Sequence, residues 1–220
     1  MMMTQVDIKA VLFDFGGVIT TSPFEAFARF ERENGLPSDF IRRINATNPD
    51  TNAWARLERS EVGLEEFDAL FAAEARAAGH ELSGLTVLTL LDGDIRPEMV
   101  TALRLCRERF ALGCITNNIV PHEKDLDRDA TPKELEILEI LGLFDHVVES
   151  SKIGIRKPDP RIYQLACDAM GVSPEQSVYL DDLGINLKPA RALGMATIKV
   201  ISAKQALDEL QKILEIPLLD

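Results

Sequence analysis

The feature that most restricts the fold is a series of short, apolar, strand-like segments separated by stretches with helical periodicity. The strand-like segments span residues 10–13, 112–116, 146–149, 177–180 and 196–200. Most of them lack the polar alternation of a half-exposed strand, which is typical of strands buried on both faces. Because strands that alternate with helices are joined by right-handed crossovers, the sequence predicts an α/β fold with a mostly parallel sheet.

One interval breaks this alternation. Residues 20–94 have helical patterns only, and they open with Ser22-Pro23-Phe24-Glu25, which has the form of a capping box with proline at the first helical position. We therefore predict a core domain of residues 1–19 and 95–220, with a small helical insertion at residues 20–94. An insertion at the carboxyl end of a strand lies over the ligand crevice, where it excludes water and selects substrates, so we expect it to act as a cap.

Aromatic side chains recur along this insertion. They are Phe24, Phe27, Phe30, Trp54, Phe67 and Phe71. Two interpretations fit them: they form the small core of the cap, or they line an apolar substrate pocket. We favour the first, because a small helical unit needs a core of its own.

The charge balance excludes some classes of partner. The formal net charge is -12 and the isoelectric point is about 4.8, which argues against binding nucleic acid or an anionic membrane through a general positive field. An anionic ligand therefore requires a locally positive site, and the basic residues within 152–160 supply a candidate. The chain has neither a basic start followed by an apolar run nor 18 consecutive apolar residues, so we expect a soluble cytoplasmic protein with no membrane partner. The sequence carries no signal for an oligomeric state.

Polar side chains follow three of the predicted strands. Asp14 ends the first strand, Thr116 and Asn117 end the second, and the adjacent pair Asp181 and Asp182 ends the fourth. Ligands of open parallel sheets bind at this edge. Adjacent carboxylates repel each other unless a cation lies nearby, and a site made only of oxygen ligands favours magnesium. Neighbouring strand side chains point to opposite faces, so one of Asp181 and Asp182 should ligate the metal directly, and spacing leaves open which one.

Taken in order, these residues resemble the four motifs of the haloacid dehalogenase-like (HAD) hydrolase superfamily. The matching positions are Asp14, Thr116-Asn117, Lys157-Pro158, and Asp181-Asp182 followed by Asn186. The resemblance extends over essentially the whole chain. Residues 179–191 and 22–25 also resemble the N-terminal phosphatase domain of soluble epoxide hydrolase. This resemblance implies a Rossmann-like parallel-sheet core with a small helical cap.

The resemblance also implies a mechanism. A magnesium-dependent phosphatase of this kind hydrolyses a small phosphorylated metabolite through an aspartyl-phosphate, with Asp14 as nucleophile and Lys157 neutralising charge. By the same resemblance, Mg²⁺ is bound by the Asp14 carboxylate, the Gly16 carbonyl and Asp182. Asp181 and Asn186 support that metal site. Thr116 and Asn117 bind the phosphoryl group.

Gly16 departs from the family pattern. Most phosphatases of the superfamily have a second Asp there, which acts as general acid and then as general base, a role worth about 10²–10⁴-fold in rate. His122 is a tempting substitute, although a lone loop histidine is more often a bystander. Without a resident acid, we expect a preference for leaving groups that depart as weak bases, such as acyl, aryl or sugar-1 phosphates.

Two other functions remain open at this stage. In a 2-haloacid dehalogenase Asp14 would displace halide from carbon, but that reaction has no use for the acidic pair Asp181-Asp182. The second alternative is a non-catalytic, phosphate-responsive binding or regulatory module that lost its chemistry when glycine replaced the acid at position 16. Retention of Asp14 and Lys157 favours a working enzyme over such a module.

Overall fold

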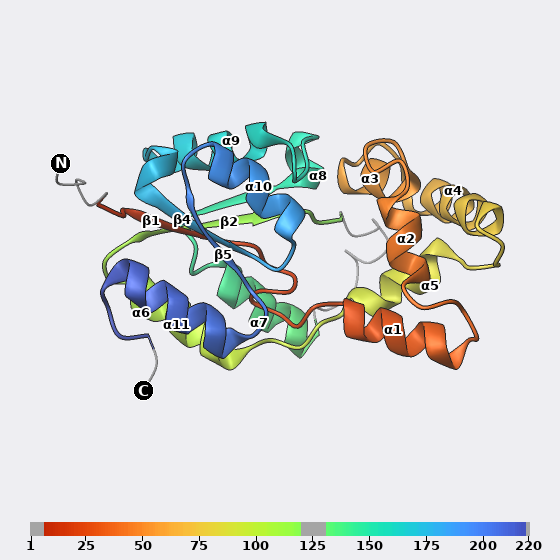
Figure 1. The fold of residues 1–220 in the computed structure, drawn as a ribbon, viewed down its shortest axis with the longest axis horizontal. Helices are drawn as coiled ribbons and strands as arrows, with labels where there is room; N and C mark the ends of the chain where they lie inside the picture. The colour runs from red at the N-terminus through yellow and green to blue at the C-terminus, as the bar shows by residue number, and fades with distance from the viewer. Residues whose placement is uncertain (1–6, 120–130, 219–220) are drawn as a thin grey trace.

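The apolar segments form one parallel sheet in the computed structural model, which describes residues 7–119 and 131–218. The strands are β1 (Ala10–Phe13), β2 (Ala111–Thr116), β3 (His146–Glu149), β4 (Ser177–Asp181) and β5 (Ala196–Lys199). Their order across the sheet is β3-β2-β1-β4-β5, with β1 between β2 and β4 (Figure 1). The fold class is therefore the expected α/β, Rossmann-like one.

The predicted strand boundaries agree with the observed ones to within one residue. The central strands β1 and β4 are buried along their whole length, as expected. The outer strands β3 and β5 are more exposed, because each has a neighbour on one side only. Full burial therefore holds for the middle of the sheet and not for its edges.

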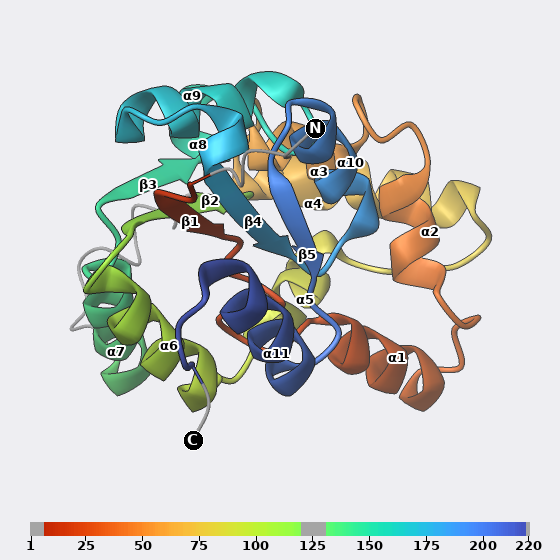
Figure 2. The ribbon, with the colours of Figure 1, turned by 60° about the vertical axis from the view of Figure 1, so that its left-hand side comes forward.

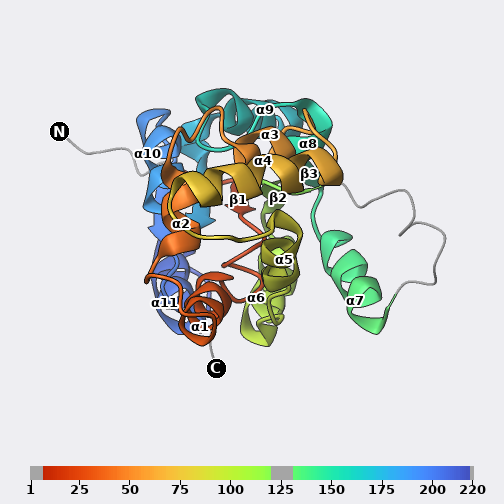
Figure 3. The same cartoon turned by 90° about the vertical axis from the view of Figure 1, so that its right-hand side faces the viewer.

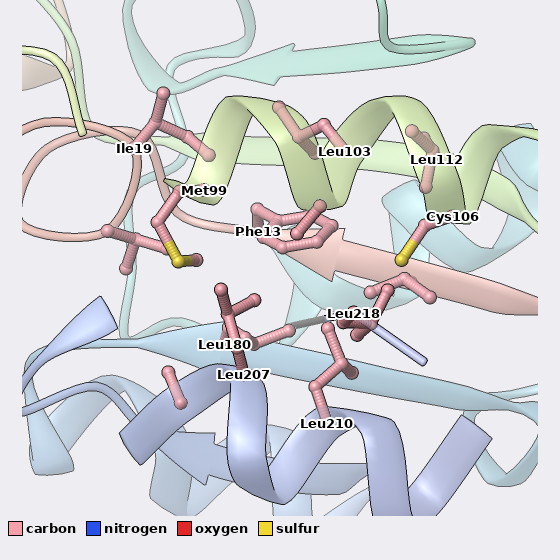
Figure 4. Packing of buried hydrophobic residues seen from close by; sticks show 14 of the residues in the cluster. Phe13, Ile19, Met99, Leu103, Cys106, Leu112, Leu180, Leu207, Leu210 and Leu218 are labelled. Atoms are coloured by element: carbon pink, nitrogen blue, oxygen red, sulfur yellow. The ribbon is translucent and has the colours of Figure 1, made fainter. Parts of the chain in front are cut away.

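Helices cover both faces of the sheet (Figure 2). Helices α6 (Pro97–Arg107), α7 (Pro132–Leu141) and α11 (Ala203–Leu214) pack on one face, and α9 (Pro160–Met170) and α10 (Gly184–Ala192) pack on the other. Figure 4 shows Phe13 between Leu103 of α6 and Leu207 of α11. Because side chains alternate along a strand, the neighbouring Leu12 packs on the opposite face, in the same buried cluster as Tyr163 and Leu187.

The helices between β1 and α6 gather at the end of the sheet to which the strands point (Figures 1 and 3). They are α1 (Phe24–Glu33), α2 (Phe40–Ala46), α3 (Ala53–Glu58), α4 (Leu64–Ala77), α5 (Gly84–Leu88) and the short 3-10 helix η1 (Thr89–Leu91). These helices have a hydrophobic cluster separate from the two clusters of the sheet. Phe27, Phe67 and Phe71 are buried in it, which confirms that they form a core of their own.

The segments that enter and leave this helical region lie side by side. Thr20 and Ile95 form an isolated antiparallel bridge, and the Thr21 N–H donates to the Asp94 carbonyl at 2.8 Å. The chain thus leaves the sheet region and returns to it at one place, next to the carboxyl end of β1.

The predicted capping box at residues 22–25 is wrong. Helix α1 begins at Phe24 with Pro23 as its N-cap residue, and no side chain caps it. The Ser22 hydroxyl instead donates a hydrogen bond to Asp182 across the sheet edge. Ser22 therefore bonds to a residue distant in sequence, which sequence spacing does not show, and does not cap the helix that follows it.

The remaining elements are short. They are α8 (Ser150–Ile153), which follows β3, and the 3-10 helix η3 (Pro174–Gln176), which precedes β4. None of the helices in the two described ranges combines the length and apolar character needed to cross a lipid bilayer.

Candidate active site

Strand pairing brings three carboxylates together at the carboxyl edge of the sheet. Phe13 of β1 lies opposite Leu180 of β4, so Asp14 and the pair Asp181 and Asp182 leave the sheet at the same level. One oxygen from each of the three carboxylates lies within 4.8 Å of the other two. Within the described residues, this is the one group of acidic, histidine or cysteine side chains that fits around a metal ion.

Lys157 reaches this cluster from the loop after α8 and is 1% exposed. Its Nζ lies 2.8 Å from Asp14 Oδ1, 3.0 Å from Asp181 Oδ2 and 3.1 Å from the Tyr179 hydroxyl. An ammonium group has three protons, so all three find acceptors. Burial alone would lower the pKa of Lys157, but the attraction of Asp14 and Asp181 outweighs it and raises that pKa above its usual value.

The two neighbouring aspartates have different surroundings. Asp181 is fully buried and accepts hydrogen bonds from Lys157, from the Tyr179 hydroxyl at 2.5 Å, from Asn186 Nδ2 at 3.1 Å and from the Leu183 N–H at 2.8 Å. Asp182 accepts one side-chain hydrogen bond in the described part of the chain, from Ser22 at 3.1 Å. Asp181 is therefore saturated with donors, whereas Asp182 keeps lone pairs for a ligand.

Three carboxylates share one ammonium group, so the site carries an excess of negative charge. Burial raises the pKa of Asp14 well above its usual value, and Asp181 and Asp182 add to this effect while Lys157 opposes it. Burial together with Asp181 also raises the pKa of Asp182. Asp14 and Asp182 thus resist losing their protons, and a cation that entered the cluster would favour their charged carboxylate forms.

The glycines after Asp14 have opposite steric surroundings. A Cβ built on Gly17, whose φ is +80°, would lie 2.3 Å from Asp182 Oδ2. A Cβ built on Gly16 would meet nothing within 4 Å. Asp182 can therefore approach the β1 turn because residue 17 lacks a side chain, while open space remains beside residue 16.

The predicted phosphoryl-binding residues lie at the end of the adjacent strand. Thr116 is the last residue of β2, and Asn117 follows it. The Asn117 side chain is engaged with protein groups: its Oδ1 accepts from the Lys157 N–H at 2.8 Å, and its Nδ2 donates to the Lys157 carbonyl and to Glu58, each at 3.1 Å. This side chain therefore holds the Lys157 loop beside β2.

The sequence interpretation missed three polar residues of this region. Tyr179 lies two residues before Asp181 and points to the same face of β4, a signal that strand periodicity contains. The sequence pattern predicts a helix cap for Ser22 in place of its contact with Asp182, and it gives no signal for Glu58 of α3. The candidate acid His122 lies outside the described residues.

Comparison with known proteins agrees with this geometry. A family model for haloacid dehalogenase-like hydrolases matches residues 8–194. Bifunctional epoxide hydrolase 2 of Rattus norvegicus is 37% identical over 218 residues, which are 94% of this chain and 39% of that protein. Acyl-CoA dehydrogenase family member 10 of Mus musculus is 34% identical, over 96% of this chain and 19% of that protein. The chain thus spans less than half the length of these relatives.

Other relatives match over nearly their whole length. A phosphatase of Mycobacterium tuberculosis is 30% identical over 92% of both chains. The structure of a HAD family enzyme from Bacteroides thetaiotaomicron, in complex with magnesium and inorganic phosphate, superposes with a TM-score of 0.59 at 22% identity and covers 92% of this chain and 98% of its own. The chain therefore belongs to the haloacid dehalogenase-like hydrolase family.

Proposed function

We propose that this hydrolase is a magnesium-dependent phosphatase that acts on a small phosphorylated metabolite through an aspartyl-phosphate on Asp14. The observation that carries the proposal is the contact of the Asp14 carboxylate with a buried lysine, beside two further carboxylates. The relative from Mycobacterium tuberculosis, which this chain matches over 92% of both lengths, is itself named a phosphatase.

Asp14 would act as the nucleophile. Its side chain is 10% exposed, and one oxygen, Oδ1, is held by the Phe15 N–H at 2.7 Å and by Lys157. The second oxygen would attack phosphorus while the bond from phosphorus to the leaving oxygen breaks and the leaving group departs as an anion. Water would then attack the same phosphorus and lose a proton to solvent, the bond from phosphorus to Asp14 would break, and inorganic phosphate would be released. An anionic carboxylate and a phosphate repel each other, so the Lys157 ammonium has to offset that repulsion.

The donor set fits magnesium, because all the available groups are hard oxygen ligands. Asp14, Asp182 and the Gly16 carbonyl would hold the ion. Asp181, which is saturated with hydrogen bonds, would orient Lys157 and Asn186 in support of it. When bound, the ion would supply a second positive charge against the phosphoryl oxygens.

Thr116 and Asn117 would hold the transferring phosphoryl group. Since the Asn117 amide is already hydrogen bonded to protein groups, the groups left for phosphoryl oxygens are the Thr116 hydroxyl and backbone N–H groups of this turn. Residues 20–94 would form the cap over the site. Its helices have a separate hydrophobic cluster and lie at the end of the sheet where Asp14 is found, both of which support this division of the chain.

The glycine at position 16 would limit the range of leaving groups. In most phosphatases of the family, an acid at this position protonates the departing oxygen. In this chain the leaving group would have to depart as a stable anion, so acyl, aryl and sugar-1 phosphates are the substrates we expect.

The first prediction concerns phosphatase activity. The purified chain should release 4-nitrophenol from 4-nitrophenyl phosphate with magnesium and lose that activity in EDTA. Asp14→Asn should lower the rate by at least about 10⁴-fold, because it removes the nucleophile. The surface variant Asp208→Asn, which alters an exposed ion pair with Lys204, is the matched control and should keep the wild-type rate.

A folded wild-type chain with no more activity than Asp14→Asn would contradict the proposal. That result would instead support a non-catalytic, phosphate-responsive module.

The second prediction concerns leaving groups. Rates for a series of aryl and alkyl phosphates should fall steeply as the pKa of the leaving group rises, because no acid protonates it. Gly16→Asp should flatten this dependence and speed alkyl phosphate hydrolysis by about 10²–10⁴-fold. A Cβ at position 16 would meet nothing within 4 Å. Gly16→Ala is the control, and a flat dependence in the wild-type chain would show that another acid operates.

The third prediction concerns Gly17. In Gly17→Ala, a Cβ would collide with the Asp182 carboxylate and occupy a backbone conformation with φ +80°, which costs about 1–3 kcal/mol outside glycine. The magnesium concentration that gives half-maximal activity should therefore rise by at least about 10-fold. Gly16→Ala keeps its carbonyl and should leave this concentration unchanged. Equal magnesium requirements in the two variants would place the ion away from Asp182.

A further inference from the structure

A buried carboxylate joins the inserted helices to the site. Glu58, the last residue of α3, is 7% exposed. Its Oε2 accepts from Arg156 Nε at 2.5 Å and from Asn117 Nδ2 at 3.1 Å, and its Oε1 accepts from Trp54 Nε1 at 2.8 Å. The Glu58 carbonyl accepts from the Ser150 hydroxyl at 2.7 Å. Glu58 therefore contacts core groups that follow β2, begin α8 and precede Lys157.

These contacts reach the nucleophile in a short series. Glu58 holds the Asn117 amide, which bonds the backbone of Lys157 on both sides, and the Lys157 ammonium lies against Asp14. Each group in this series is buried or partly buried, so each contact is stronger than it would be in water. A displacement of α3 would thus change the position of Asn117 and, through it, the Lys157 loop.

Charge explains why an acid stands at position 58. The Arg156 side chain is 19% exposed and forms an ion pair with Glu58 Oε2, at the boundary between the inserted helices and the core. Both oxygens of Glu58 already accept hydrogen bonds, so this residue is not positioned to donate a proton to a leaving group. Removing one partner of such a pair leaves the other charge buried and unpaired.

We propose that Glu58 is a positioning residue that docks the inserted helices on the core and thereby sets the phosphoryl-binding turn at Thr116 and Asn117. The inference rests on the proposed phosphatase function. Docking of α3 and binding of a phosphoryl group then favour each other, because both need Asn117 and the Lys157 loop in one arrangement, and such coupling is reciprocal. Ile119, which packs against the cluster of the inserted helices, extends the same turn into the interface.

The test uses the full chain with magnesium and inorganic phosphate. Hydrogen exchange of the α3 backbone amides, residues 53–58, is measured with and without phosphate, together with kcat and KM for 4-nitrophenyl phosphate. Phosphate should slow exchange in α3 of the wild-type chain. In Glu58→Gln that protection should disappear and kcat/KM should fall by about 10²-fold, the usual size for a displaced catalytic group.

Two further variants keep the test decisive. Glu61→Gln is the matched control, because Glu61 pairs with Arg59 on the exposed side of the same segment and does not contact the core groups. It should retain the protection and the kinetic constants. Arg156→Gln removes the core partner of Glu58, together with the Arg156 hydrogen bond to the Pro49 carbonyl, and leaves the sequence of the inserted helices unchanged. It should reproduce the loss if Glu58→Gln proves unable to fold.

The outcomes separate this inference from the proposed function. Phosphate protection of α3 that depends on Glu58, in a chain without turnover, would support the coupling and reject the phosphatase proposal. Turnover with wild-type kinetic constants in both Glu58→Gln and Arg156→Gln, and with α3 protection unchanged, would overturn the role of Glu58 alone.

Discussion

The rest of the site depends on the burial of the Lys157 ammonium between Asp14 and Asp181. A buried charge is stable in a protein when it is paired and hydrogen bonded, and the three protons of Lys157 have Asp14, Asp181 and Tyr179 as acceptors. The pairing holds the Asp14 carboxylate in one position. Within the described residues Asp182 has no ion pair of its own and accepts a side-chain hydrogen bond from Ser22 alone, so a further cation would be favoured there.

The sheet order creates this pairing. Strands β1 and β4 are neighbours, so residues far apart in sequence end at the same edge with their carboxylates together. The helices inserted after β1 gather over that edge. In our account Glu58 connects them to the turn after β2, so the inserted region sets the geometry of the site as well as covering it.

Much of this arrangement could be predicted from the sequence, because parallel strands place their terminal residues at one edge. The strand ends alone predict that Asp14, Thr116 and the Asp181-Asp182 pair lie at that edge, and the structure has them there. The local pattern at Ser22 gave a wrong prediction of a helix cap. The Ser22 hydroxyl instead donates a hydrogen bond to Asp182, which is distant in sequence. Glu58 could not be found in this way, since its contacts depend on how helices separated by long stretches of sequence pack together.

The separate roles of the adjacent aspartates also required the structure. Strand periodicity shows that they point to opposite sides, and only the hydrogen bonds show which one is saturated. The Asp181 carboxylate accepts hydrogen bonds from Lys157, Tyr179 and Asn186. The Asp182 carboxylate accepts one from Ser22. The carboxylate with fewer hydrogen-bond donors is therefore that of Asp182, which lies beside Gly17.

We propose above all that this buried negative charge makes the site bind magnesium. It is tested most directly by the free energy of unfolding of the wild-type chain and of Asp182→Asn, measured in EDTA and in increasing magnesium. Our account predicts that magnesium stabilises the wild-type chain, by about 2.7 kcal/mol at a concentration of 100 Kd, and stabilises Asp182→Asn far less. No stabilisation of the wild-type chain, or equal stabilisation of both, would contradict it.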